Sequence, residues 1–70
     1  MPVGIVQFFL DKKGYGYIRV PETREEFYVR RRHLKAPVEQ RDLVRFIVRG
    51  DKQGLYAAEV ERIEDDQAEK

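Results

Sequence analysis

Five short apolar runs, each bounded by turn-forming residues, constrain the fold of this chain more than any other feature. Three of the gaps between them read DKKG, PETRE and DKQG, and the fourth is a longer connection; the runs themselves cover residues 3–10, 15–20, 26–29, 43–50 and 55–63. Runs of this length, separated by Gly, Pro and Asp, are typical of β-strands joined by turns. The sequence therefore predicts a small all-β barrel or sandwich.

Two segments are open to more than one interpretation. Residues 55–63 include Ala57, Ala58 and Glu59 and could form a helix by propensity, but the DKQG turn before them favours a hairpin strand. The connection 31–42 is interrupted by Pro37 and has room for a single helical turn around residues 32–35. We expect one domain over residues 1–63 and an acidic, flexible tail over residues 64–70.

The core of such a domain has to come from aliphatic and aromatic side chains alone. The chain has 70 residues and no cysteine, so neither disulfides nor thiolate metal sites can supplement burial. Its apolar runs are far shorter than the roughly 20 residues of a membrane span, and its N-terminus does not resemble a secretory signal. We expect a cytoplasmic monomer that does not associate with membranes.

Side chains alternate across a strand, and this alternation sorts the three middle runs into two faces. The purely apolar set, which we expect in the core, is Ile18, Val20, Phe27, Val29, Val44, Phe46 and Val48. The opposite face of residues 15–30 combines rings with cations, namely Tyr15, Tyr17, Arg19, Tyr28 and Arg30. The first run contains two adjacent apolar pairs, Ile5–Val6 and Phe8–Phe9, which indicate a bend, a bulge or burial on both faces.

Rings and cations on one outer face suit single-stranded nucleic acid, whose bases stack on the rings while its phosphates meet the cations. Tyr15 and Tyr17 alone are better explained as a packing pair, but Tyr28 and Arg30 on the same face shift the balance towards a binding platform. The uneven distribution of charged residues also suggests a polyanionic partner for the body of the chain. Residues 61–70 hold 2 of the 14 basic and 5 of the 13 acidic residues, which leaves 12 basic and 8 acidic residues in positions 1–60.

The segments GIVQFFLDKKGYGYI, EFYVRRRHL, DLVRFIV and GLYAAEV resemble the bacterial cold-shock proteins, over roughly residues 3–63. KGYGYI matches the first ribonucleoprotein motif of that family, with tyrosines where phenylalanines are usual. FYVR stands where the second motif is expected. The resemblance implies a five-stranded antiparallel barrel of the oligonucleotide/oligosaccharide-binding (OB) type. It also implies single-stranded RNA or DNA as the partner and a role as RNA chaperone or antiterminator.

Together, the residues and the resemblance assign a set of nucleic-acid-binding side chains. The expected stacking and phosphate-binding residues are Phe8, Phe9, Lys13, Tyr15, Tyr17, Tyr28, Arg30 and Arg31. Phe9 is either a further ring of the platform or a core residue. Phe8 stands where the family usually has tryptophan, Arg30 where it has histidine, and Arg31 where a further aromatic is common. The smaller ring of Phe8 is expected to stack more weakly, and the exchange at Arg31 shifts the expected site from stacking towards electrostatics.

Other readings of the basic segment are open. The three arginines 30–32 could form a solvated patch paired with Glu22, Glu25 and Glu26, and His33 is expected to be an ordinary loop residue.

The whole domain could also serve as an RNA-feeding module of a larger ribonuclease system. Alternatively, it could be an OB-type protein–protein interaction module whose tyrosine face is the interface.

The residue inventory argues against catalysis. The chain has no Ser and no Cys, and it has a single Thr and a single His. Nucleophiles of the Ser–His or Cys–His type are therefore excluded, and a His-based metal site lacks further His or Cys ligands. We expect no enzymatic activity, no cofactor, no metal and no small-molecule substrate.

Overall fold

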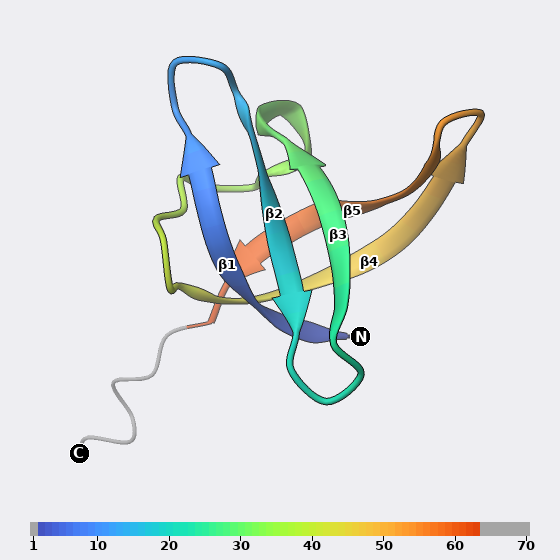
Figure 1. Ribbon diagram of the computed structural model, residues 1–70. Coiled ribbons are helices and arrows are strands. Elements are labelled where there is room, and N and C mark those ends of the chain that lie inside the picture. The colour runs from blue at the N-terminus through green and yellow to red at the C-terminus, as the bar shows by residue number, and fades with distance from the viewer. Residues whose placement is uncertain (1, 64–70) are drawn as a thin grey trace.

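The computed structural model describes residues 2–63, in which five strands close into a barrel (Figure 1). A short 3₁₀ helix, η1 (Arg31–His33), follows the third strand. The strands are β1 (Val3–Leu10), β2 (Tyr15–Val20), β3 (Glu25–Arg30), β4 (Leu43–Asp51) and β5 (Gly54–Arg62). Each predicted run is a strand to within one residue at either end, and the last run is a strand rather than a helix. The acidic segment 64–70 lies outside the described residues.

Around the barrel, the strands follow the order β1-β2-β3-β5-β4, and β4 closes the ring by pairing with β1. Four of the five neighbouring pairs are antiparallel, but β3 and β5 run parallel, with Tyr28 opposite Tyr56. The expectation of a wholly antiparallel barrel is therefore wrong, because the sheet is mixed. The physical reason is parity: an odd number of strands cannot alternate in direction all the way around a closed ring.

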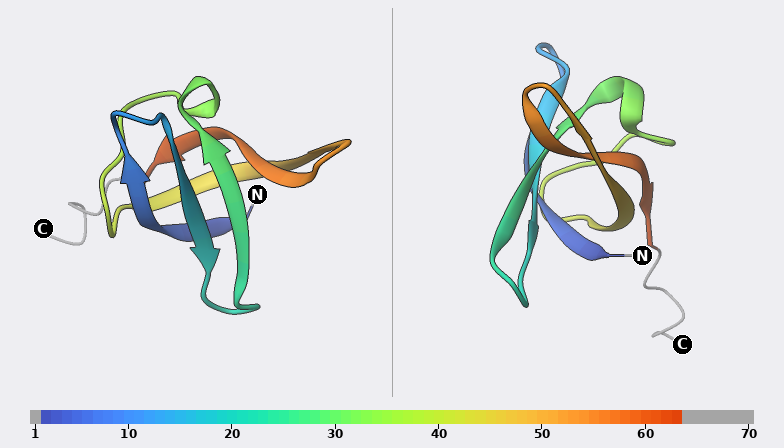
Figure 2. Two further views of the ribbon diagram at one scale, coloured as in Figure 1. Left: turned by 45° about the horizontal axis from the view of Figure 1, so that its top comes forward. Right: turned by 90° about the vertical axis from the view of Figure 1, so that its right-hand side faces the viewer.

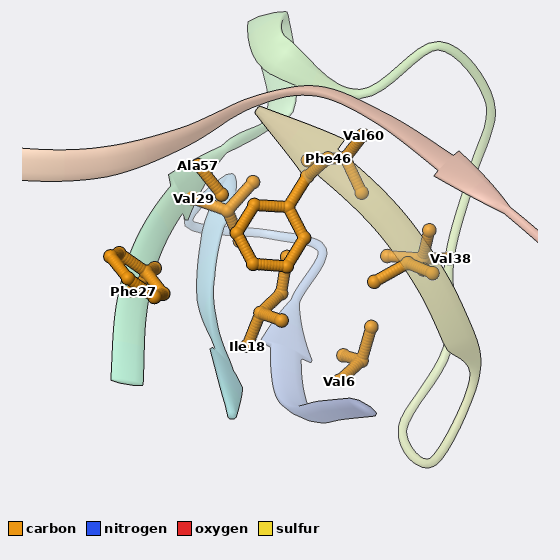
Figure 3. Close-up of a cluster of buried hydrophobic side chains, with 9 residues drawn as sticks. Val6, Ile18, Phe27, Val29, Val38, Phe46, Ala57 and Val60 are labelled. Atoms are coloured by element: carbon orange, nitrogen blue, oxygen red, sulfur yellow. The ribbon is translucent and has the colours of Figure 1, made fainter. Parts of the chain in front are cut away.

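The barrel interior is filled by apolar side chains from every strand and from the connection after η1 (Figure 3). The buried cluster consists of Val6, Ile18, Phe27, Val29, Val38, Val44, Phe46, Ala57 and Val60. Phe46 lies at its centre, and the Phe46 ring centroid is 5.5 Å from that of Phe27. Five of the seven predicted core residues belong to this cluster, and Val20 packs against it while half-buried.

Val48 is the one predicted core residue that the structure contradicts, since it is 41% exposed. The outer half of the β4–β5 hairpin extends past the barrel beyond β3, as Figures 1 and 2 show. Burial along β4 therefore ends at Phe46, although Ala57, which pairs with Val48 on β5, is still 0% exposed. Leu55, on the neighbouring strand of the same hairpin, is 63% exposed.

A bulge in β1 explains the adjacent apolar pairs of the first run. The pairing register with β2 shifts between Val6 and Phe8, so Gln7 is the additional residue. Val6 therefore points into the barrel and Phe8 points out of it, two positions later.

Within residues 2–63, no helix has the length and apolar character needed to cross a membrane.

Gly16 is required by the close approach of β1 and β2. A Cβ at this position would overlap the backbone carbonyl oxygen of Phe8 and lie 2.9 Å from the Cα of Phe9. The residue between the two tyrosines therefore has to be glycine, because the β1 backbone passes directly over it. This contact holds Phe8 beside the tyrosines of β2.

Candidate functional site

Four aromatic rings lie together on the outer face of β1, β2 and β3. Phe8 is opposite Tyr17, and Tyr17 is opposite Tyr28, so the three rings form a row across three strands. The ring centroids are 5.6 Å apart for both of these pairs. Tyr15 completes the group, 6.5 Å from Phe8 and 5.8 Å from Tyr28. We call these four residues the ring platform.

The ring platform is built on the core. Ile18, Phe27 and Val29 alternate with the tyrosines along β2 and β3 and point inward, where they are buried. All four platform rings are half-buried, and each contacts two of the others. Such rings are held in place before any ligand arrives, so little side-chain entropy is lost when one binds.

The remaining predicted residues lie around this platform at different places. Phe9 points to the opposite side of β1 and packs against the core cluster, so the structure gives it the core role. Lys13 is exposed in the turn between β1 and β2. The Arg31 backbone N–H donates to the carbonyl of Gly14 at 2.9 Å, which brings Arg31 against the same turn. Lys13 and Arg31 therefore lie together at the Tyr15 end of the platform.

Arg30 joins the platform directly. It is opposite Tyr15 in the β2–β3 pairing, and its Cζ atom is 5.5 Å from the centroid of the Tyr28 ring. This distance is within the range of a cation–π contact. At the other end of the same hairpin, Glu25 and Glu26 are opposite Val20 and Arg19. The Tyr15 end therefore carries Lys13, Arg30 and Arg31, whereas the opposite end combines Arg19 with two glutamates.

The arginines of the basic segment are not paired with the glutamates that the sequence offered as partners. The ion pairs formed among residues 2–63 are Arg45–Glu61 and Arg49–Glu59 at 3.0 Å and Arg62–Asp42 at 3.5 Å. Arg30, Arg31 and Arg32 are all exposed, and none of them takes part in these pairs. Their charges are available to an anionic ligand.

A groove of about 660 Å³ lies between the platform and the outer half of the β4–β5 hairpin. It is lined by residues 51–55 of the hairpin and by side chains from β2, β3, η1 and β5, namely Tyr17, Tyr28, Arg30, Arg32, His33 and Tyr56. We call this space the hairpin groove. The extension of the hairpin that bounds it is visible in the left view of Figure 2.

His33 lies in this groove rather than in an ordinary loop, which corrects the expectation for this residue. It is half-buried at the end of η1, and its ring centroid is 4.8 Å from that of Tyr56, with 34° between the ring planes. Burial lowers the pKa of His33, and the positive charges of Arg32, Arg30 and Arg49 lower it further.

Tyr56, Arg32 and His33 are groove residues that the sequence-based prediction missed. Tyr56 becomes a neighbour of Tyr28 only through the parallel pairing of β3 and β5. No local pattern indicates that pairing, because the two strands are separated by η1, a long connection and β4. The signal available in the sequence was limited to a fourth tyrosine and the single histidine.

No group of three His, Asp or Glu side chains within residues 2–63 is placed to hold a metal ion.

In a comparison with models of known protein families, the chain matches none. A search of curated proteins likewise finds no similar sequence. The chemistry of the site therefore has to be interpreted from its own geometry, which combines stacking surfaces with cations that form no ion pair within residues 2–63.

Proposed function

We propose that the ring platform binds single-stranded nucleic acid with little sequence preference. Bases stack on Phe8, Tyr15, Tyr17 and Tyr28, and nearby cations contact the phosphates. The observation that carries this proposal is the cluster of four mutually contacting, half-exposed rings across three strands. Every base has a flat face that can stack, so such a surface accepts any sequence, and each stack contributes about 1–3 kcal/mol.

The cations that serve this platform are Lys13, Arg30 and Arg31. All three are exposed, and none forms an ion pair with another residue in the described part of the chain. They lie at the Tyr15 end of the platform, so a phosphate backbone crossing that end meets positive charge without displacing a carboxylate. Affinity should therefore fall as salt rises, with a logarithmic slope of about −0.7 for each phosphate contact to a single strand.

The fold supports a more specific proposal for the class of protein. A closed five-stranded barrel with its platform on β1, β2 and β3 is compatible with an OB barrel of the cold-shock type, and the motifs KGYGYI and FYVR agree with this assignment. A protein that binds only unpaired strands stabilises the open form of RNA by mass action. We infer a role like that of an RNA chaperone or antiterminator, acting in the cytoplasm without catalysis.

A fluorescence titration with a labelled single strand of about eight nucleotides tests the proposal, since one OB barrel covers about 4–16 nucleotides. We expect micromolar or tighter binding that weakens with salt and that exceeds binding to a duplex of the same sequence. Failure to bind any single strand at low salt would overturn the proposal. In that case, the tyrosine face is better explained as a protein–protein contact surface, where Tyr and Arg are also enriched.

A charge variant with a matched control sharpens this test. Arg30→Gln removes a cation of the platform, and Arg62→Gln removes one that pairs with Asp42. We expect Arg30→Gln to reduce the salt slope by about 0.7, and Arg62→Gln to leave the slope as in the unmodified protein. Equal slopes in all three proteins would exclude Arg30 from phosphate binding.

A further inference from the structure

We propose that the hairpin groove is a second nucleotide subsite, in which the Tyr56–His33 pair stacks a base and His33 takes up a proton as the phosphate enters. The inference rests on the proposed function, because the nucleotide belongs to a single strand that already lies on the ring platform. The subsite extends binding from three strands of the barrel to β5 and to η1.

The row of rings leads into the groove. Phe8, Tyr17, Tyr28 and Tyr56 are paired in register across four neighbouring strands, from β1 to β5. Tyr17 and Tyr28 belong both to the platform and to the lining of the groove. A strand that crosses the platform from Phe8 towards Tyr28 therefore reaches Tyr56 next.

The groove has the size and the stacking surface that a nucleotide needs. Its volume of about 660 Å³ falls within the range of about 300–1,000 Å³ that is usual for small-ligand sites. The Tyr56 ring is half-buried against the imidazole of His33, with 4.8 Å between the centroids, and this contact fixes its orientation. A stacking surface held in this way binds a base at low entropic cost.

The charges in the groove favour a phosphate. Arg30, Arg32 and Lys52 line it, and they come from β3, η1 and the β4–β5 turn. The one carboxylate in the lining belongs to Asp51, and its Oδ1 already accepts a hydrogen bond from the backbone N–H of Gln53 at 2.8 Å. The lining is therefore positive overall, and its single acid has a structural partner.

Protonation of His33 is linked to occupancy of the groove through the charges around it. In the free protein, the imidazole faces Arg32 of η1, Arg30 of β3, and Arg49 of β4, whose guanidinium is bound to Glu59 of β5. Burial and these cations hold the pKa of His33 below its ordinary value of 6.5. A phosphate in the groove opposes the cations and raises that pKa. Affinity should then increase as pH falls through the pKa of the complex and level off below that of the free protein.

Proton NMR of the full chain tests this linkage directly, because His33 is the single histidine and its imidazole signals are unambiguous. His33 is titrated in the free protein and in the protein saturated with oligothymidylate of about eight nucleotides that lacks terminal phosphates. We expect a higher pKa in the complex, and an affinity that increases up to about tenfold for each unit of that rise. An unchanged His33 pKa at saturation would overturn the proposal.

Two variants isolate the subsite from the platform. Tyr56→Ala should weaken binding by about 5- to 150-fold, the effect of one base stack. Leu43→Ala removes an exposed apolar side chain of β4 outside the groove lining, so it should leave affinity unchanged. His33→Gln should remove the change of affinity between about pH 8 and about pH 5. If Tyr56→Ala fails to fold by circular dichroism, the NMR titration of the unmodified protein decides.

The outcomes separate this inference from the proposed function. An unmodified protein that binds no single strand refutes both. Binding that is sensitive to Tyr17→Ala but not to Tyr56→Ala refutes the subsite alone. An abasic strand of equal length carries the phosphates without the bases, so we expect it to bind more weakly than oligothymidylate. Equal affinity for the two strands would refute base stacking on the platform and on Tyr56 together, so the Tyr56→Ala variant is what isolates the subsite.

Discussion

Phe27 and Tyr28 are adjacent aromatic residues with opposite tasks, and replacing each by alanine gives the sharpest test of the ring platform. Phe27 points into the barrel, is 7% exposed and contacts the ring of Phe46. Tyr28 points outward and contacts Tyr15 and Tyr17. The two substitutions share one strand and nearly the same loss of volume, so each serves as the control for the other.

The expected magnitudes differ enough to be separated. Phe27→Ala should cost about 3–5 kcal/mol of unfolding free energy, as buried phenylalanines do. Tyr28→Ala loses two aromatic pairs worth about 0.5–1.5 kcal/mol each, so it should cost about 1–3 kcal/mol. A domain of this size has a total stability of only about 4–10 kcal/mol, so Phe27→Ala should be marginally folded while Tyr28→Ala keeps its fold.

Affinity should follow the opposite order. Tyr28→Ala removes a stacking surface and should weaken binding of a single-stranded oligonucleotide by about 1–3 kcal/mol. Phe27→Ala leaves the outer face in place, so its affinity per folded molecule should be unchanged. Urea denaturation gives the folded fraction of each variant. Fluorescence titration at low temperature gives the apparent affinity, which is corrected by that fraction to obtain the affinity per folded molecule. Phe27→Leu leaves a smaller cavity and serves as a second core variant.

Two results would refute this reasoning. The first is a Phe27→Ala variant whose affinity per folded molecule falls as much as that of Tyr28→Ala. The second is a Tyr28→Ala variant that unfolds as readily as Phe27→Ala and binds normally when folded. The second result would show that the outer rings of β2 and β3 stabilise the sheet and do not form a binding surface.

Three further predictions concern the fold. Gly16→Ala should cost at least about 3 kcal/mol in thermal unfolding, because the added carbon overlaps a carbonyl oxygen of β1. Val48→Lys should change stability by less than about 0.5 kcal/mol in urea denaturation, whereas Val44→Lys, at a position that is 0% exposed, should prevent folding. The hydrogen bond and charge of Arg45 lower the pKa of Glu61. The ionised carboxylate therefore stabilises the fold at pH values above its ordinary pKa of 4.5. This contribution to stability is lost as pH falls through the lowered pKa of the folded protein. Thermal unfolding midpoints of Glu61→Gln should therefore depend less on pH below about 4.5 than those of the unmodified protein.

Local features of the sequence were sufficient to predict the strands and the three tyrosines of the platform, whereas Phe8 was assigned to it through the family resemblance. Turn residues follow each apolar run, and the antiparallel β2–β3 hairpin is closed by a short turn that fixes its register. Alternation then places Tyr15, Tyr17 and Tyr28 on one face, and this prediction is confirmed. The bulge between Val6 and Phe8 was one of three interpretations that the sequence left open, because adjacent apolar pairs do not obey alternation.

The groove could not be predicted in the same way. Tyr56 and His33 meet through the pairing of β5 with β3 and the packing of η1, and both contacts join parts of the chain that are distant in sequence. Val48 follows the apolar alternation of β4, yet it is exposed, because it lies in the half of the hairpin that extends past the barrel. Alternation reports which side a residue faces and does not report what lies on that side.

The sequence by itself determined five strands, an apolar inner face and an outer face of rings and cations, because period-two alternation and turn chemistry are local properties. Only the tertiary structure decided that the sheet is mixed, since five strands in a closed ring force one parallel pair, here β3 with β5. That pair brings Tyr56 beside Tyr28, and the ring of Tyr56 in turn lies 4.8 Å from that of His33. The hairpin groove therefore exists because the barrel closes.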